Sequence, residues 1–137
     1  MTIKEVPYGA TRIPIKKFDI NNMVDYCTIA IIAKRASGKS FLTREIMFQK
    51  KNIVSTIVVS RTEKLNSFYS EFIPDLYIYS EYDSTILTRI FKRQALMNEH
   101  NKERSKKNKK PKDDSLMLIM DDCMSSKGRW LNDPNIL

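Results

Sequence analysis

Eight residues in the first third of the sequence have the types and order of a phosphate-binding loop. Residues 33–40 read AKRASGKS and match the pattern G-x-x-x-x-G-K-[ST], with alanine in place of the first glycine. In such a loop, backbone N–H groups and the positive end of the following helix bind phosphate oxygens. Lys39 would reach the β- and γ-phosphates of a nucleotide, and the Ser40 hydroxyl would bind Mg²⁺. The predicted nucleotide-binding residues are Ala33, Lys34, Arg35, Ala36, Ser37, Gly38, Lys39, Ser40 and Phe41.

The alternative for this segment is a surface turn that opens an ordinary helix. Its context favours the phosphate loop, because an apolar run precedes it and a segment without Gly or Pro follows. Ala33 and Ala36 stand where many such loops carry glycine. If either position needs a positive φ, its β-carbon costs about 1–2 kcal/mol, and nucleotide affinity would be weaker.

Two carboxylates end another apolar run, LMLIMDD at residues 116–122. A buried parallel strand delivers the residue that follows it to the carboxyl edge of the sheet, where ligands of open α/β sheets bind. Asp121 would hold Mg²⁺ through water, and Asp122 would orient or deprotonate the attacking water. The alternative is a strand that simply leads into a turn.

Composition excludes several other kinds of site. The 137 residues contain two cysteines and one histidine, too few for a disulfide framework or a zinc site of the usual spacing. A catalytic triad would have to use His100, which lies in a polar, lysine-rich stretch. Cys123 is expected to be a small buried hydrophobe. The N-terminus lacks the apolar region of a secretory signal, and no apolar run is long enough for a membrane helix.

Apolar, β-branched runs alternate with segments of helical periodicity, which predicts an α/β fold with βαβ units and a parallel sheet. Residues 1–25 are expected to be a lead-in with a short edge strand around 12–18, and residues 26–137 a single core. Aromatic side chains between residues 68 and 82 are expected to pack in that core. Strands are predicted over 26–33, 53–60, 76–80 and 116–120, and helices over 39–51, over 62–72 and after the N-cap Asp83.

The positive charge is concentrated in one segment. Residues 102–112 hold seven Lys or Arg and one Glu, a net charge of +6, while the other 126 residues carry a net charge of only +2. We interpret this basic segment as a solvated, disordered insertion between a helix and a strand. The alternative is a contact with DNA phosphates, which would be strongly salt-dependent. No aromatic residue interrupts the segment, so base stacking is not expected.

Three motifs in the same order resemble one known family. AKRASGKSFL is similar to that family's GKRGSGKSFL, and residues 58–83 resemble its T-E…F-Y…F-I-P…I-Y…Y-D segment. IMDDC, with Trp130 downstream, resembles its Walker B region. With Met23-Val24-Asp25 ahead of the first motif, the resemblance spans roughly residues 20–135 and is to the genome-packaging ATPases of nucleocytoplasmic large DNA viruses. That family includes the poxvirus packaging ATPase, in the FtsK–HerA branch of P-loop motors.

The resemblance implies a P-loop NTPase three-layer sandwich that hydrolyses ATP with Mg²⁺ to move double-stranded DNA into a preformed capsid. It further implies a homo-oligomeric ring, capsid portal or vertex proteins as partners, and a place in the cytoplasmic virus factory or the virion. Lys39 and Asp122 would be catalytic, and Ser40 and Asp121 would bind the metal. In relatives further strands follow, so the C-terminal strands of the sheet are expected to be missing here.

Two alternatives remain open. The chain could be a truncated, nucleotide-binding or inactive subunit that modulates a full-length ATPase ring. It could also be a small-molecule kinase, although nothing after Ser40 reads as the arginine-bearing lid that a kinase needs.

Overall fold

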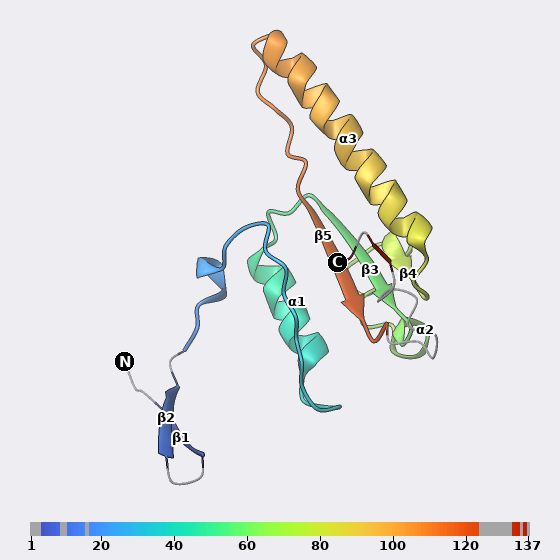
Figure 1. Cartoon of the computed structure of the whole chain (residues 1–137). Helices are drawn as coiled ribbons and strands as arrows, with labels where there is room; N and C mark the ends of the chain where they lie inside the picture. Colours follow the sequence, from blue (N-terminus) through green and yellow to red (C-terminus); the bar gives the residue numbers. More distant parts are fainter. Residues whose placement is uncertain (1–3, 9–10, 16, 124–132, 135, 137) are drawn as a thin grey trace. The chain divides into compact units, whose positions relative to one another are not determined.

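The computed structural model shows two units, Met1–Lys51 and Asn52–Leu137, and each is described by itself (Figure 1). None of the described helices is long and apolar enough to cross a membrane. The structure describes residues 4–8, 11–15, 17–123, 133, 134 and 136.

The first unit opens with an antiparallel hairpin. Strand β1 (Lys4–Tyr8) pairs with β2 (Thr11–Ile15), which lies where the sequence predicts an edge strand. A single turn of 3-10 helix, η1 (Ile20–Asn22), follows, and the Asp19 carboxylate caps it by accepting the Asn21 N–H at 3.0 Å.

Residues 26–33 do not form the predicted strand. The segment has no strand or helix assignment, and Tyr26 and Ile32 are 92% and 93% exposed. A run of β-branched residues becomes a strand only when a neighbour satisfies its backbone N–H and C=O groups. None of the described residues pairs with this segment in a ladder, so its strand propensity is not realised.

Helix α1 (Lys39–Gln49) confirms the helix predicted over residues 39–51. Its last turn closes when the Lys50 N–H donates to the Ile46 carbonyl at 2.9 Å. The Lys50 ammonium also donates to the Met23 carbonyl at 2.9 Å and pairs with Asp25 at 3.0 Å. These contacts tie the end of α1 to the segment that precedes the loop.

The second unit is built on a three-stranded sheet in the order β4–β3–β5. Strand β3 (Ser55–Ser60) lies between β4 (Ile78–Tyr79) and β5 (Leu116–Asp121), and both pairings are parallel. The unit therefore has the predicted α/β character with a parallel sheet. In the register, Ser60 lies opposite Asp121, which puts the carboxyl ends of β3 and β5 side by side.

Short helical segments connect β3 to β4. The helix predicted over residues 62–72 forms only as α2 (Glu63–Asn66), and η2 (Asp75–Tyr77) precedes β4. Ser67 ends α2 in the left-handed region, with φ 49°, and the chain then turns through residues 68–73. This turn carries Tyr69, whose side chain is buried.

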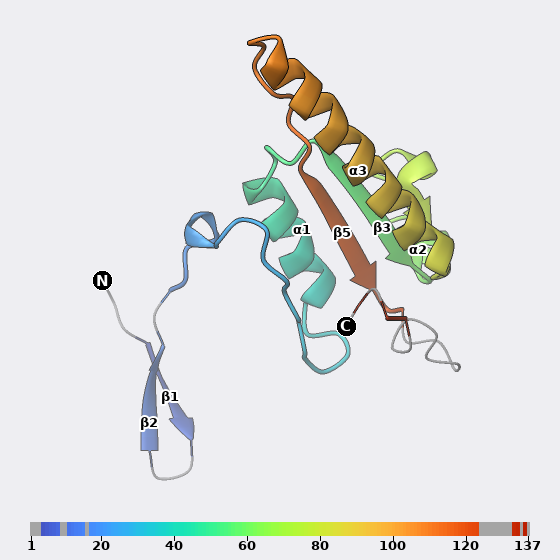
Figure 2. The ribbon, with the colours of Figure 1, turned by 45° about the horizontal axis from the view of Figure 1, so that its top comes forward.

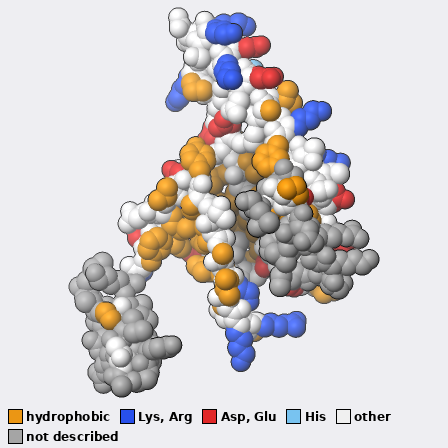
Figure 3. Space-filling view, in the orientation of Figure 1, with side chains coloured by type: hydrophobic (Ala, Val, Ile, Leu, Met, Phe, Trp, Pro, Cys, Tyr) orange, Lys and Arg blue, Asp and Glu red, His pale blue; other side chains and the backbone are white. Residues whose placement is uncertain are grey.

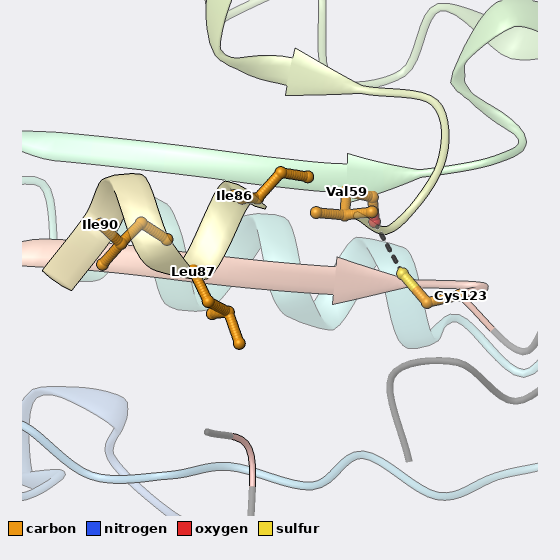
Figure 4. Packing of buried hydrophobic residues seen from close by; sticks show 5 residues of the cluster. All are labelled: Val59, Ile86, Leu87, Ile90 and Cys123. Atoms are coloured by element: carbon orange, nitrogen blue, oxygen red, sulfur yellow. Dashed lines mark hydrogen bonds between the residues drawn. The ribbon is translucent and has the colours of Figure 1, made fainter. Parts of the chain in front are cut away.

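Helix α3 (Ser84–Lys106) closes the core of the second unit (Figures 2 and 4). Asp83 is its N-cap, as predicted, and accepts the Thr85 N–H at 2.7 Å. The first turns of α3 pack against β3 and Cys123, the second residue after β5. The buried cluster consists of Val59, Ile86, Leu87, Ile90 and Cys123, with Tyr79 and Tyr82 packed against it.

The basic segment is not a disordered insertion. Residues 102–106 form the last turn of α3, and residues 107–115 run back from its end to β5. Figures 1 and 2 both show the second half of α3 extending beyond the amino ends of β3 and β5. The basic residues thus lie at the end of the sheet opposite to Asp121.

Candidate functional site

The phosphate-loop sequence adopts a tight turn that leads directly into α1. Two of its residues have left-handed backbones, Ala36 with φ 58° and Gly38 with φ 88°. A β-carbon at Gly38 would meet no atom within 4 Å, so the glycine is needed for its conformation and not for space. Ala36 also has a positive φ but carries a β-carbon, so it has the unfavourable conformation that the sequence analysis considered for this position.

Lys39 is held on the loop itself. Its Nζ atom donates to the Ala33 carbonyl at 3.2 Å and to the Lys34 carbonyl at 3.1 Å. A side chain at the first position of α1 therefore reaches back over the five residues that precede it. This arrangement keeps the positive charge of Lys39 beside the turn.

The start of α1 adds further positive potential. Gly38 is the N-cap and supplies no side-chain cap, and the first turn contains no acidic residue. The first N–H groups of a helix have no acceptor within the helix, and the helix dipole is positive at that end. Ser40 lies in this turn, half-buried, and Phe41 beside it is 62% exposed. The loop, the lysine and the helix start all fit a phosphate group.

In the second unit, polar side chains gather where β3 and β5 end. We call Ser60, Thr62, Glu63, Tyr69 and Asp121 the carboxyl-edge cluster. The Tyr69 hydroxyl donates to Asp121 Oδ2 at 2.8 Å, and the Ser60 and Thr62 hydroxyls are 3.3 Å apart. Burial raises the pKa of Tyr69 above its usual value, and the hydrogen bond to Asp121 raises it further. Tyr69 therefore acts as a neutral donor.

Glu63 fixes the turn that carries Tyr69. Its buried carboxylate accepts the Tyr69 N–H at 3.0 and 2.9 Å and the Ser70 N–H at 2.8 Å. Burial alone would raise the pKa of Glu63, but the backbone hydrogen bonds from Tyr69 and Ser70 outweigh it, and the pKa is lowered. An ionised carboxylate thus holds the backbone from which the tyrosine reaches Asp121.

The two residues after β5 have different environments. Asp122 is exposed, and its φ of 53° is left-handed, a conformation that aspartate tolerates better than most residues. Cys123 is buried and donates from Sγ to the Val59 carbonyl at 3.1 Å. Burial raises the pKa of this thiol to about 11, so it is a packing residue, as predicted, and not a nucleophile.

Each predicted half of the site is formed within its own unit. Lys39 and Ser40 belong to the first unit, and Asp121 and Asp122 to the second. The meeting of the two halves stays a prediction. Among the described residues, no three His, Cys, Asp or Glu side chains cluster so that they could hold a metal ion by themselves. Trp130, which belongs to the family resemblance in the sequence, lies outside the described residues.

Sequence reasoning missed the role of Tyr69. The aromatic side chains between residues 68 and 82 were expected to pack, and Tyr69 does so, with Phe68 and Phe72 in edge-to-face or tilted contact. Its hydroxyl also joins the carboxyl-edge cluster. The sequence feature that bears on this role is Glu63, an acidic residue without an assigned role, whose carboxylate holds the Tyr69 backbone.

Comparisons with known proteins give relatives in large DNA viruses. No protein-family model matches the sequence. No solved structure matches it significantly. Uncharacterized protein L437 of Acanthamoeba polyphaga mimivirus is 40% identical over 116 residues, which cover 85% of this chain and 40% of that protein.

Two further relatives come from other viruses. Uncharacterized protein 075L of Invertebrate iridescent virus 6 is 37% identical over 82% of this chain and 44% of its own length. Uncharacterized protein 015R of Frog virus 3 is 31% identical over 79% of this chain and 31% of its own length. The chain therefore resembles viral proteins, of which it spans less than half the length.

Proposed function

We propose that this chain is the ATP-binding core of a P-loop motor that packages viral double-stranded DNA. The observation that carries the proposal is Lys39, whose ammonium group lies on the Ala33 and Lys34 carbonyls of a turn that opens α1. A lysine beside a left-handed turn at a helix start suits a nucleotide phosphate, because the helix N-terminus and the ammonium group both favour an anion. The parallel sheet and the viral relatives agree with this proposal.

In this proposal each unit supplies one part of the catalytic machinery. Lys39 and the first-turn amides of α1 bind the β- and γ-phosphates, and Ser40 binds Mg²⁺. From the second unit, Asp121 supports the metal, and Asp122 orients the attacking water. Bound ATP would supply the phosphoryl group, and Mg²⁺ would neutralise the negative charge on its phosphate oxygens.

The carboxyl-edge cluster supports the role of Asp121. A carboxylate that holds a metal through water needs a fixed orientation, and Tyr69 fixes one oxygen of Asp121 by a 2.8 Å hydrogen bond. Asp122 follows on a left-handed backbone and remains exposed. In the proposal, Asp121 therefore has a fixed orientation, and Asp122 is accessible to water.

The complete motor belongs to the proposal as well. The chain spans 40% of the mimivirus relative and 44% of the relative in Invertebrate iridescent virus 6. We therefore propose the motor activities for a protein of the length of these relatives: DNA translocation, a homo-oligomeric ring and contacts with capsid portal or vertex proteins. The cytoplasmic virus factory or the virion is the proposed place of action.

One observation favours a second function, an inactive or nucleotide-binding subunit that modulates a full-length ring. Ala36 adopts φ 58°, a conformation that costs a residue with a β-carbon about 1–2 kcal/mol. If the free loop relaxes out of this conformation in solution, binding must restore it, and nucleotide affinity falls by the corresponding factor. The two functions differ in turnover, since only the motor hydrolyses ATP.

Calorimetric titration with Mg-ATP tests the proposal. Wild-type protein should bind, and Lys39→Ala should abolish binding because it removes the cation from the loop. Lys17→Ala is the matched control, since Lys17 is an exposed lysine of the same unit outside the loop. Far-ultraviolet circular dichroism verifies that each variant is folded. Absence of binding by folded wild-type protein, or equal loss in both variants, would overturn the proposal.

A further inference from the structure

The second half of α3 and the segment that follows it form one projecting element. We call residues 95–113 the arm. Figures 1 and 2 show that it leaves the sheet at the amino ends of β3 and β5. At its base, Arg93 Nη1 and Gln94 Nε2 both donate to the Asp114 carbonyl, at 3.2 and 3.0 Å. Arg93 Nη2 also donates to Ser55 Oγ at 2.8 Å, which anchors the base to β3.

Hydrogen bonds hold the returning segment against the helix. Asn101 makes a reciprocal pair with Lys112: its Nδ2 donates to the Lys112 carbonyl at 2.9 Å, and its Oδ1 accepts the Lys112 N–H at 2.8 Å. At the tip, Arg104 Nε donates to the Lys110 carbonyl at 2.8 Å, and the Arg104 carbonyl accepts the Lys109 N–H at 2.9 Å. These contacts close the tip into a defined turn.

The arm therefore presents its charges from a fixed scaffold. Six of its seven basic side chains in residues 102–112 are exposed, and Arg104 is half-buried. Among the described residues, no ion pair is formed by any of the seven. Glu99, Glu103 and Asp113 are the carboxylates of the arm, and Figure 3 shows acidic side chains among the basic ones there. The net charge over residues 102–112 remains +6.

The composition of the arm indicates which polyanion it fits. Between residues 98 and 114, Pro111 is the only apolar residue and His100 the only ring, so this part of the arm has no hydrophobic anchor for a bilayer and no Phe, Tyr or Trp for stacking on bases. What it offers is a row of lysines on a rigid support. Duplex DNA carries about one phosphate charge per 1.7 Å of axis, a dense and regular array of anions for such a row.

We infer that the arm binds the phosphate backbone of double-stranded DNA without reading its sequence. This inference deepens the proposed function, because it assigns the surface that contacts DNA. Within the second unit, the arm and Asp121 lie at opposite ends of the parallel sheet. DNA binding by the arm therefore leaves the carboxyl edge open and does not depend on nucleotide.

Salt-dependent binding of a fluorescent duplex of about 30 base pairs, followed by anisotropy, tests the inference. The arm variant changes four exposed lysines to glutamine, which retains helix propensity. The control variant makes the same change in charge at four exposed lysines outside the arm. The arm substitutions are Lys106→Gln, Lys107→Gln, Lys109→Gln and Lys110→Gln, and the control substitutions are Lys17→Gln, Lys51→Gln, Lys64→Gln and Lys92→Gln.

The expected result is a large effect of the arm variant alone. Each neutralised phosphate contributes about −0.9 to the slope of log K against log salt, so losing four contacts should lower the slope by about 3 to 4. Affinity near 100 mM salt should fall by at least about tenfold. Replacing the same four lysines by arginine should preserve binding, which separates loss of charge from a folding defect.

Three results would overturn the inference. They are an equal loss in the control variant, an unchanged slope in the arm variant, and tighter binding of acidic vesicles or single-stranded RNA than of the duplex. Mg-ATP titration of the same arm variant distinguishes this inference from the proposed function. Failure of wild-type protein to bind Mg-ATP, with the salt slope intact, would remove the ATPase proposal and leave the arm as a DNA-binding element.

Discussion

The Tyr69 hydroxyl donates a hydrogen bond to Asp121 Oδ2 over 2.8 Å and joins two segments 52 residues apart in the sequence. The tyrosine is 1% exposed, so water does not compete for its hydroxyl. Its own backbone is held by the carboxylate of Glu63. The orientation of a carboxylate at the end of β5 thus depends on a turn that follows β3.

Tyr69→Phe should destabilise the second unit by about 1–2 kcal/mol, because it removes a buried donor from a carboxylate. Urea denaturation measures the change in the free energy of unfolding. Tyr77→Phe is the control, since Tyr77 is 46% exposed and should tolerate the loss of its hydroxyl within about 0.5 kcal/mol. If both variants lose the same stability, the bond to Asp121 contributes nothing specific.

The same variant carries a prediction for the proposed site. With Asp121 released from its donor, affinity for Mg-ATP should fall more than affinity for ATP measured in the presence of a chelator. A structural role alone would change both affinities equally. Calorimetric titrations of wild type and Tyr69→Phe, each with and without Mg²⁺, separate the two outcomes.

Glu63→Gln should lower stability by about 2 kcal/mol near neutral pH, because an amide cannot accept all the backbone bonds that the carboxylate accepts. The pKa of Glu63 is lowered in the folded state from an ordinary value of 4.5. Its stabilisation is therefore present above pH 4.5 and is lost as the pH falls through the lower folded pKa.

Wild type should consequently lose its advantage over Glu63→Gln when urea midpoints are measured from pH 6 down to pH 3. Glu71→Gln is the control, since Glu71 is exposed. A constant difference between wild type and Glu63→Gln over the whole range would show that the charge of Glu63 is not what stabilises the turn.

Substitutions at Gly38 and at Ala36 should have opposite effects on backbone strain in the loop. Gly38→Ala should destabilise the first unit by about 1 kcal/mol or more, because φ 88° disfavours a β-carbon although the space is open. Ala36→Gly relieves the same strain, which offsets the ordinary cost of about 0.5–1 kcal/mol for a more flexible unfolded chain. Ala33→Gly, with no strain to relieve, should show that cost in full.

Thermal unfolding of the three loop variants ranks them directly. Ala36→Gly should be more stable than Ala33→Gly, and both should be more stable than Gly38→Ala. If Ala36→Gly also raises affinity for Mg-ATP, strain in the loop limits binding. Equal stability of Ala36→Gly and Ala33→Gly would mean that the left-handed conformation of Ala36 costs nothing.

Local sequence patterns predicted most helices and strands. The prediction failed at residues 26–33, where a strand depends on pairing with a distant segment. The apolar runs that became β3 and β5, and the N-cap Asp83 of α3, carry their signals within a few residues. Residues 26–33 have an equally apolar pattern, but a strand exists only beside a partner, and no described residue provides one. Composition cannot report that dependence.

The candidate site divides in the same way. The turn at Gly38 and the helix that starts at Lys39 follow from a short local pattern, so both could be predicted. The link from Tyr69 to Asp121 depends on the parallel register of β3 and β5 and on the turn after α2, which no short pattern contains. The arm was misjudged because lysine content predicts solvation, while its order comes from side-chain bonds of Asn101 and Arg104 to the returning backbone.

The two cysteines should react at very different rates with an alkylating agent. Cys27 is exposed, whereas Cys123 is buried and its pKa is raised from 9.0 to about 11. Only the thiolate reacts, so at pH 8 the raised pKa alone slows alkylation of Cys123 about a hundredfold, and burial slows it further.

Mass spectrometry after timed exposure to iodoacetamide should find one fast modification, at Cys27, in folded protein. In urea both cysteines should react at similar rates, which shows that the difference comes from the fold. The variant Cys27→Ser should remain unmodified over the time in which wild type takes one label. Rapid labelling of Cys123 in that folded variant would mean that the core formed by β3, β5 and α3 opens on the timescale of the reaction.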